Sequence, residues 1–271
     1  AKILINAVAT LLFWALLLTV LAGVIGAPLL ILVIATGFSG GPAYDASVVM
    51  TRIMFPYIGL ISMVSLSAGI LNTYQRFAIP AFTPVLLNLA LIGSAIFLAP
   101  HLDQPIYALS LGVLIGGVLQ LAIQVPSLLR LGLLPRIGLL PKAIKAALSN
   151  PDARRVMKLM GPAVFAVSVA QISLIINTNI ASHLADGSVS WLSYADRLME
   201  LPTGLLGVAL GTILLPSLSK AHACGDHSEY SSLLDWGLRL TILLATPAAV
   251  ALMVLSEPIT TTLFHYGKFD T

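Results

Sequence analysis

Residues 188–204 read Ser-Val-Ser-Trp-Leu-Ser-Tyr-Ala-Asp-Arg-Leu-Met-Glu-Leu-Pro-Thr-Gly, and they place Asp196, Arg197 and Glu200 inside a long apolar segment. Each such ionisable group costs roughly 2.5–3.5 kcal/mol at the centre of a bilayer on insertion scales. Charged side chains in these segments face a protein interior or a water-filled cavity and seldom face lipid. We therefore expect the rest of the chain to be a membrane scaffold that gives this cluster a wet, protein-lined position.

The composition supports a membrane scaffold. Hydrophobic residues make up 58% of the 271 residues and charged residues only 9%, whereas soluble domains carry about 25% charged residues. Apolar runs long enough to cross a bilayer recur along the whole length, which predicts an all-α polytopic membrane protein. The net charge of +3 does not indicate a nucleic-acid partner, because the basic residues lie in loops between apolar runs. The single cysteine, Cys224, excludes an internal disulfide.

Seven membrane spans are predicted. They cover about residues 4–35, 47–73, 81–99, 106–129, 158–184, 189–219 and 232–256. The chain begins without a methionine and ends directly after a hydrophobic segment. We therefore expect it to be an internal piece of a longer transporter.

Lysine and arginine divide unequally between the two ends of these spans. The loops at 36–46, 100–105 and 185–188 contain neither residue type. The opposite loop ends carry Lys2, Arg76, Arg130, Arg136, Lys142, Lys145, Arg154, Arg155, Lys158 and Lys220. Because positive loops stay in the cytoplasm, we expect residue 1 on the cytoplasmic side and residue 271 on the outer side.

The longest polar connection divides the predicted spans into two parts. We expect a four-helix part over 1–130, a basic cytoplasmic loop over 131–157 and a three-helix part over 158–271. Within the loop, residues 142–148 have the pattern of a short amphipathic helix on the inner membrane surface. A basic segment of this kind fixes topology and touches anionic lipids.

The sixth span carries the candidate site. At spacings of three and four, one helical face collects Ser190, Ser193, Arg197, Glu200 and Gly204. Asp196 lies at the edge of this face. Arg197 and Glu200 can pair within the helix, and Pro202 predicts a kink near 198–202. We interpret the face as the lining of a polar cavity, and the alternative is a structural ion pair that holds helices together.

Two further sets of polar residues occur within spans. In the fifth span, Gln171, Asn177 and Thr178 either line the same cavity or form hydrogen bonds between helices. In the seventh span, Asp235 and Arg239 are spaced as an i,i+4 ion pair, which predicts a structural pair, a gate or a substrate contact.

No enzyme motif accompanies these residues. The sequence contains no hydrolase triad pattern, phosphate-binding loop, zinc motif or dinucleotide fingerprint. Charged groups within spans, together with glycine and proline in helices, point to translocation rather than to bond-making chemistry.

Several strings of the sequence are specific enough to compare with known families. They are Phe55-Pro-Tyr57, Ile70-Leu-Asn-Thr73 through Pro80-Ala-Phe-Thr-Pro-Val-Leu-Leu-Asn88, Gln171-Ile-Ser-Leu-Ile-Ile-Asn-Thr178, Tyr194-Ala-Asp-Arg-Leu-Met-Glu200 and Gly207-Val-Ala-Leu-Gly-Thr-Ile-Leu-Leu-Pro-Ser-Leu-Ser219. These strings resemble the bacterial lipid II flippases (the MurJ/MviN family) of the multidrug/oligosaccharidyl-lipid/polysaccharide exporter superfamily. The resemblance extends over essentially the whole chain.

The resemblance implies a fold and a site. Family members have about fourteen helices in two lobes around a central cavity, and this chain is similar to their third to ninth helices. Arg197 matches an essential cavity arginine, Asp196 and Glu200 match cavity acids, and Ser190 matches a position on the same face. The cavity arginines of the family's first two helices, and the lipid-tail groove of its last helices, have no counterpart in this chain.

The resemblance also implies a function. The parent protein would be a transporter of the bacterial inner membrane that moves lipid II, the undecaprenyl-pyrophosphate-linked precursor for peptidoglycan synthesis, from the inner to the outer leaflet. Arg197 would bind the pyrophosphate, and Asp196 and Glu200 would hold Arg197 or bind a coupling cation. No cofactor is expected, although transport could be coupled to the membrane potential or to a monovalent cation. Membrane lipids and cell-wall synthesis proteins are the other expected partners.

Two alternatives stay open at this point. A cation-coupled drug or oligosaccharide-lipid exporter of the same superfamily would use the same fold with a more acidic cavity. A non-transporting membrane scaffold would instead recruit cell-wall enzymes through the basic 130–157 loop.

Overall fold

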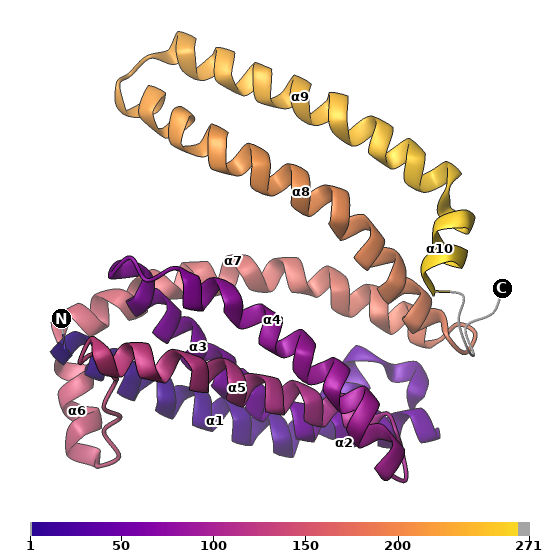
Figure 1. The fold of residues 1–271 in the computed structure, drawn as a ribbon, viewed down its shortest axis with the longest axis horizontal. Helices are drawn as coiled ribbons and strands as arrows, with labels where there is room; N and C mark the ends of the chain where they lie inside the picture. Colours follow the sequence, from indigo (N-terminus) through magenta and orange to yellow (C-terminus); the bar gives the residue numbers. More distant parts are fainter. Residues whose placement is uncertain (1, 265–271) are drawn as a thin grey trace. The chain divides into compact units, whose positions relative to one another are not determined.

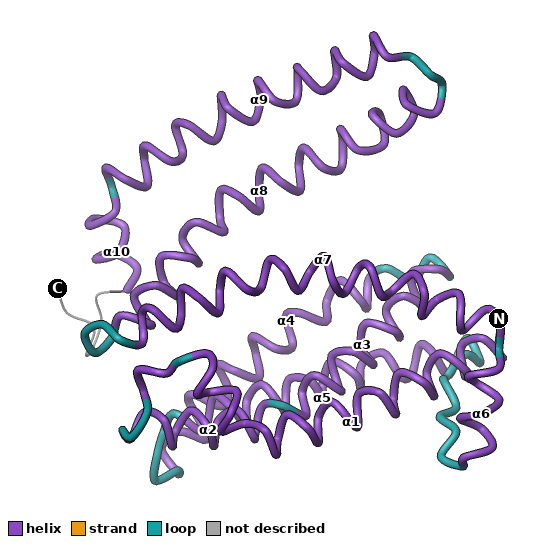
Figure 2. Tube along the Cα trace, turned by 180° about the vertical axis from the view of Figure 1, so that it is seen from behind, coloured by secondary structure: helices purple, strands orange, loops and turns teal. Residues whose placement is uncertain are grey.

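The structure is a computed structural model that describes residues 2–264. Every regular element in that range is a helix (Figure 1, Figure 2). The longer helices are α1 (Lys2–Ile34), α2 (Pro42–Met54), α3 (Pro56–Thr73), α4 (Ala78–Gly93), α5 (Tyr107–Arg130), α7 (Pro151–Ser182), α8 (Ser188–Ala223) and α9 (His227–Val254). The shorter pieces are η1 (Thr36–Phe38), η2 (Ser94–Leu98), η3 (Ala99–His101), α6 (Pro141–Ser149) and α10 (Ser256–Phe264). The all-α prediction is confirmed.

Seven helical stretches among the described residues are long and apolar enough to cross a bilayer. The second joins α2 and α3, which are separated only at Phe55 because Pro56 has no N–H to continue the ladder. The fifth begins at Pro151 rather than near 158, because Asn150 caps it by accepting bonds from the amides of Asp152 and Ala153. The seven predicted spans are confirmed, and the chain is a multi-pass membrane protein.

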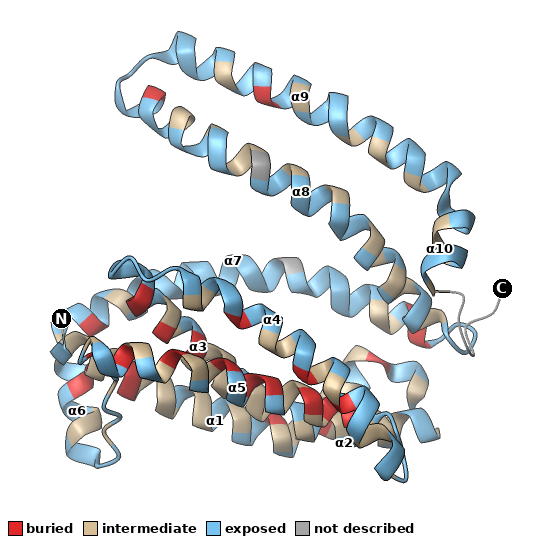
Figure 3. Ribbon diagram, in the orientation of Figure 1, coloured by how far each residue is buried: buried red, intermediate tan, exposed pale blue. Residues whose placement is uncertain are grey.

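Two compact units make up the chain. The first is Ala1–Ala185 and holds α1 to α7, and the second is Asp186–Thr271 and holds α8 to α10. The chain division expected from the basic loop, at 131–157, stays a prediction. Within each unit, much of the ribbon is coloured as exposed (Figure 3). Many large apolar residues are among the exposed ones, such as Leu18, Phe165 and Leu205. Lipid contact accounts for such exposure, because hydrocarbon tails are as apolar as leucine.

The core of the first unit lies where α5 packs against α3 and α4. Glycines on α5 let the backbones approach closely. A Cβ at Gly116 would lie 2.7 Å from Leu87 Cδ1 and 3.2 Å from its Cα, and a Cβ at Gly117 would lie 2.7 Å from the Tyr57 ring. Glycine is the residue that permits this approach between helices in lipid, where van der Waals packing is a main source of attraction.

Buried amide side chains join the same three helices. Gln120 Nε2 donates to the Thr83 carbonyl at 3.1 Å, and Gln124 Nε2 donates to Thr83 Oγ1 at 3.3 Å. Tyr57 donates its hydroxyl to Gln120 Oε1 at 3.5 Å. Gln120 and Gln124 are almost completely buried, so these bonds compensate part of the cost of placing amides away from water.

A side-chain bond compensates the proline inside α1. Pro28 cannot donate to the carbonyl of Val24, one turn earlier in the helix. Arg52 of α2 donates from Nε to that carbonyl at 3.3 Å. The hydroxyl of Tyr44, also in α2, donates to the Pro28 carbonyl at 3.1 Å. The proline of α1 is therefore matched by two donors of the next helix.

A polar strip on α1 holds the segment that follows α5. Asn6, Thr10 and Trp14 lie at i, i+4 and i+8 and so share one face. Asn6 Oδ1 accepts from the Arg136 amide at 2.9 Å, Thr10 Oγ1 accepts from the Gly138 amide at 3.0 Å, and Trp14 Nε1 donates to the Gly138 carbonyl at 3.0 Å. These bonds pair backbone groups of a segment that has no regular structure.

The short helix expected within 142–148 is present as α6. Its Ala147 is buried in a cluster with Ala7 of α1 and Ala153 of α7. One face of α6 therefore packs against protein, while Lys142 and Lys145 are exposed.

The second unit is a helical hairpin followed by a short helix. Gly225, at φ +71°, ends α8: the Gly225 amide donates to the His222 carbonyl and the Asp226 amide to the Ala221 carbonyl. This is a Schellman motif, which favours glycine at the left-handed position. Asp226 then caps α9 by accepting from the Glu229 amide at 2.9 Å. Farther along, Gly237 of α9 is buried against Leu214 of α8.

The close approach at Gly116 generates a first prediction. Gly116→Ala should lower the free energy of unfolding by about 1–3 kcal/mol, because the new methyl group would lie 2.7 Å from Leu87 Cδ1 and 3.2 Å from Leu87 Cα. Gly69→Ala is the matched control, since nothing lies within 4 Å of a Cβ there, and it should be neutral or stabilising. Thermal unfolding of the purified full-length protein measures both, and equal melting temperatures for the two variants would contradict the packing.

The polar strip on α1 generates a second prediction. Thr10→Val keeps the side-chain shape but removes the acceptor for the Gly138 amide, a loss of about 1 kcal/mol that should speed hydrogen exchange at that amide about fivefold. Thr19→Val is the control, because both threonines donate to the carbonyl four residues earlier and only Thr10 also holds the loop. Unchanged exchange at Gly138 in Thr10→Val would show that the strip does not hold the segment.

Candidate functional site

The residues expected to form the site are carried by α8. This helix begins after its N-cap residue Gly187, which has a φ of +97°. Ser190, Ser193, Arg197 and Glu200 are exposed within the described residues, and Asp196 is half-buried. The helix is continuous from Ser188 to Ala223, so the expected spacing along one face is retained.

The polar face of α8 points away from its contacts with α9 and α10. Over Ser188–Gly204, the residues of α8 that face those helices are Trp191, Tyr194, Ala195, Leu198 and Met199, which line one groove. At 100° per residue, these positions centre on the side of the helix opposite to Ser190, Ser193, Arg197 and Glu200. The charged face is therefore not used for packing inside the second unit.

The groove on the other side of α8 is apolar. Its volume is about 590 Å³, and α9 and α10 contribute Leu252, Met253 and Ile259 to its walls. The ring of Tyr194 packs on that of Phe264, with ring centroids 4.6 Å apart. The helix α8 thus has a polar face on one side and an apolar face on the other.

The glycines that follow the charges extend an open strip along α8. A Cβ at Gly204 or Gly207 would meet no described atom within 4 Å, and at Gly211 it would meet only Leu215 of the same helix. This part of the helix surface can therefore accept a close neighbour.

Of the two ion pairs that the helical spacing allows, one is formed in the described part of the chain. Arg239 and Asp235 form the predicted i,i+4 pair, with 2.8 Å between Arg239 Nε and Asp235 Oδ2. Arg197 and Glu200, by contrast, do not form an ion pair among the described residues.

The polar residues of α7 belong to the first unit. Gln171 and Asn177 are exposed there and Thr178 is half-buried, and their cavity-lining role stays a prediction. Two nearby residues of α7 form hydrogen bonds with the end of α1 and with η1. Asn179 Nδ2 donates to the Val33 carbonyl and to Thr36 Oγ1, and Ser182 Oγ accepts from the Gly37 amide at 3.0 Å.

These bonds join the end of α7 to η1. A Cβ at Gly37 would overlap the Ser182 carbonyl, so the two segments are in direct contact. Within the described residues, no three His, Cys, Asp or Glu side chains come together as a metal site would require.

The structure shows side chains with a bonding role that the sequence alone did not predict. Arg52, Asn6 and Thr10 each satisfy backbone groups of another segment. Pro28 signals that the Val24 carbonyl lacks its helical donor. The sequence does not show which side chain replaces that donor, because Arg52 lies 28 residues after Val24. The strip at 6, 10 and 14 was visible as polar residues at helical spacing.

Comparison with known proteins gives a consistent result. The family model described as lipid II flippase MurJ matches residues 1–271. The lipid II flippase MurJ of Burkholderia cenocepacia is 57% identical over 270 residues, which is 99% of this chain and 52% of that protein. The probable lipid II flippase MurJ of Buchnera aphidicola subsp. Acyrthosiphon pisum is 44% identical and covers 95% of this chain and 49% of its own length. The probable lipid II flippase MurJ of Haemophilus influenzae is 41% identical and covers 83% of this chain and 44% of its own length.

The chain spans about half the length of these relatives. The match of the family model to its full length and the level of identity confirm the resemblance drawn from the motifs. This chain belongs to the lipid II flippase MurJ family.

Proposed function

We propose that this chain is part of a transporter that moves lipid II from the inner to the outer leaflet of the bacterial cytoplasmic membrane. The observation that carries the proposal is family membership over the entire chain, together with seven apolar helices. The activity is transport rather than covalent chemistry, and the product supplies peptidoglycan synthesis.

Arg197 is the proposed headgroup contact. Its guanidinium is exposed on the side of α8 that neither α9 nor α10 covers. A planar guanidinium offers two parallel N–H donors to phosphate oxygens, so the pyrophosphate of lipid II is a matching ligand. Ser190 and Ser193 lie on the same face, where their hydroxyls can bond the substrate's polar groups.

Asp196 and Glu200 are the proposed supports of Arg197. Both carboxylates lie within one turn of the guanidinium along the helix. They can orient Arg197 when substrate is absent or hold a monovalent coupling cation, and the membrane potential is the other candidate driving force. No cofactor is required for this mechanism.

Alternating access is the proposed mode of transport. Gln171, Asn177 and Thr178 of α7 are also proposed to line the substrate cavity of the parent transporter. Rocking of the lobes about that cavity would expose the headgroup first to one side and then to the other while the lipid tail stays in the bilayer.

The distribution of charge in the first unit supports the proposed orientation. Lys2 and Arg136 line one cavity, Arg76 and Arg130 line a second, and α6 packs against the start of α1. Basic residues thus gather at the end of the unit where α1 begins, and we assign this end to the cytoplasmic side of the inner membrane.

The two alternatives are less favoured. A drug or oligosaccharide-lipid exporter would belong to another branch of the superfamily, whereas every relative named here is a lipid II flippase or probable lipid II flippase. A scaffold function would place its contacts on the basic loop, and α6 offers Lys142 and Lys145 as exposed groups. We therefore propose cell-wall synthesis proteins as partners of a transporter, and we do not propose that recruiting them is the main function of the protein.

Substitution of Arg197 tests the proposed headgroup contact. In full-length protein, Arg197→Ala should abolish growth of cells depleted of their own flippase, because the pyrophosphate loses its charged donor. Arg197→Lys should retain part of the activity, since it keeps the charge but not the paired donors.

Arg155→Ala is the control for this experiment, because Arg155 is an exposed arginine in the first turns of α7, outside the polar face of α8. Equal membrane levels of all variants are checked by immunoblotting. Full growth with Arg197→Ala would overturn the assignment.

The ion pair of α9 gives a separate prediction. Arg239 and Asp235 pair at 2.8 Å within the seventh apolar stretch, so Asp235→Asn, which leaves Arg239 without its carboxylate, should lower the melting temperature and leave growth intact. Loss of growth that the swapped pair, Asp235→Arg with Arg239→Asp, restores would instead assign the pair to a gate. Thermal unfolding and complementation are measured on the same variants.

A further inference from the structure

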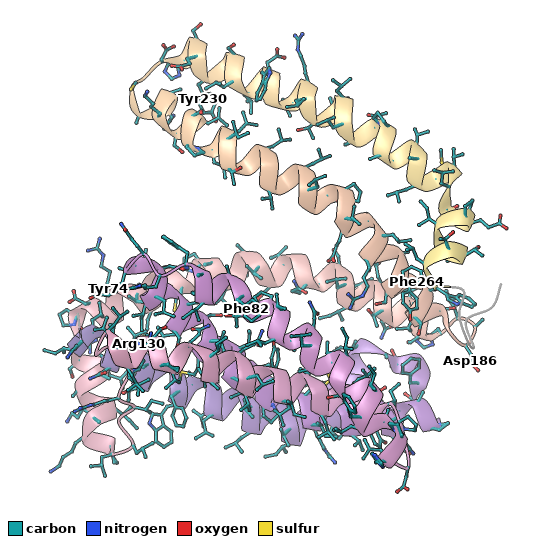
Figure 4. All side chains as sticks on the ribbon, in the orientation of Figure 1. Tyr74, Phe82, Arg130, Asp186, Tyr230 and Phe264 are labelled. Atoms are coloured by element: carbon teal, nitrogen blue, oxygen red, sulfur yellow. The ribbon has the colours of Figure 1, made fainter. Side chains whose placement is uncertain are left out.

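A cavity lies in the first unit between the α3–α4 turn and the end of α5. Its volume is about 470 Å³, and its walls include Gln75, Arg76, Phe77, Ser127 and Arg130. The proposed transport mechanism uses none of these residues. In Figure 4, the labelled Tyr74 and Arg130 lie at the same end of the helices of this unit.

The two arginines are held by matching helix ends. Gln75 has a φ of +57°, and the Arg76 amide donates to the Leu71 carbonyl at 2.9 Å. Gly132, at φ +65°, plays the same part after α5, where the Leu133 amide donates to the Leu128 carbonyl at 2.9 Å. Both ends are Schellman motifs.

These two helix ends share one core. Leu71 and Leu128, whose carbonyls accept those bonds, are fully buried in a single cluster. The backbone on either side of the cavity is therefore rigidly joined beneath it. A ligand that binds both arginines does not have to bring the two helix ends together, which lowers the cost of binding.

The charge of the cavity is not compensated by protein. No aspartate or glutamate lines it, and neither Arg76 nor Arg130 forms an ion pair with any described residue. Ser127 adds a hydroxyl donor at the wall. The first turn of α4, which also borders the cavity, contains no acidic residue and no side-chain cap. Two guanidinium groups, a hydroxyl and free helix amides together favour an anion with several oxygen acceptors.

The surroundings of the cavity indicate where such an anion comes from. Tyr74 is 44% exposed and Phe77 is 57% exposed beside it, and Leu129 is exposed on the adjoining turn of α5. Aromatic side chains next to basic residues at the ends of apolar helices are typical of the membrane–water interface. Ile79 and Leu131 line the cavity as well, so a ligand with an apolar part is accommodated.

We propose that this cavity binds the phosphate group of an anionic membrane phospholipid, held between Arg76 and Arg130 with the acyl chains against the apolar wall. The site would bind a lipid of the surrounding bilayer at the ends of α3, α4 and α5. It is independent of Arg197 and of the transport mechanism proposed for α8.

The test uses full-length protein in a neutral detergent and a fluorescent short-chain phosphatidylglycerol as probe. Arg76→Gln with Arg130→Gln should raise the Kd at least about tenfold, because two charged donors are lost. Arg155→Gln with Lys158→Gln is the matched control: it removes the same charge from exposed residues of α7 that lie outside the cavity. The control should change the Kd by less than about twofold.

Competition experiments identify the source of the phosphate. Unlabelled phosphatidylglycerol should displace the probe, whereas inorganic phosphate at equal concentration should not. An equal loss of affinity in both double variants would overturn the proposal, because binding would then follow net charge alone. Displacement by inorganic phosphate as effective as that by the lipid would overturn it as well, and would assign the cavity to a soluble anion.

Folding of the variant is controlled separately. Arg76→Lys with Arg130→Lys keeps the charge and should bind the probe more tightly than the glutamine pair. In the unsubstituted protein, raising the salt concentration should weaken binding. Salt-independent binding, or equal affinities of the lysine and glutamine pairs, would contradict a phosphate contact.

Discussion

The close approach of α5 to α3 and α4 is the constraint on which the first unit depends. Water does not drive helices together inside a bilayer, so packing and hydrogen bonds must do so. Gly116 and Gly117 bring the backbones near enough for Leu87 and Tyr57 to lie directly against α5. The same approach lets Gln120 and Gln124 reach Thr83 of α4. The close approach of α5 to its neighbours thus produces both the apolar packing and the hydrogen bonds of the buried amides.

Backbone groups left without partners are satisfied across the chain. Val24 loses its helical donor to Pro28 and receives Arg52 instead. The irregular segment after α5 has its amides bonded to side chains of α1. In a bilayer an unpaired backbone group costs several kcal/mol, so the bond from Arg52 to the Val24 carbonyl, inside the first span, is a structural requirement. Asn179 and Ser182 of α7 act in the same way, since Asn179 donates to the Val33 carbonyl and Ser182 accepts from the Gly37 amide.

The candidate site illustrates how a single helix can serve two environments. Toward α9 and α10, α8 presents Trp191, Tyr194 and Leu198, and on its other side it presents Arg197 and Glu200. Because the charges are not consumed by packing within their unit, they are free to act on a ligand or on a further helix. The α8 face and the Arg76–Arg130 cavity differ in charge. The α8 face carries carboxylates beside its arginine, whereas no carboxylate lines the cavity.

The sequence by itself determined the helical class, the seven spans, the family and the shared face of Ser190, Ser193, Arg197 and Glu200. Each of these follows from local information: hydropathy over about 20 residues, helical periodicity or a conspicuous string. Only the tertiary structure decided that Arg52 serves Val24, that Asn6 and Thr10 hold the segment at 136–138, and that Arg76 and Arg130 share a cavity. These pairs are separated by 28 to 130 residues. Which helices meet, and at what register, is set by packing, which no local pattern specifies.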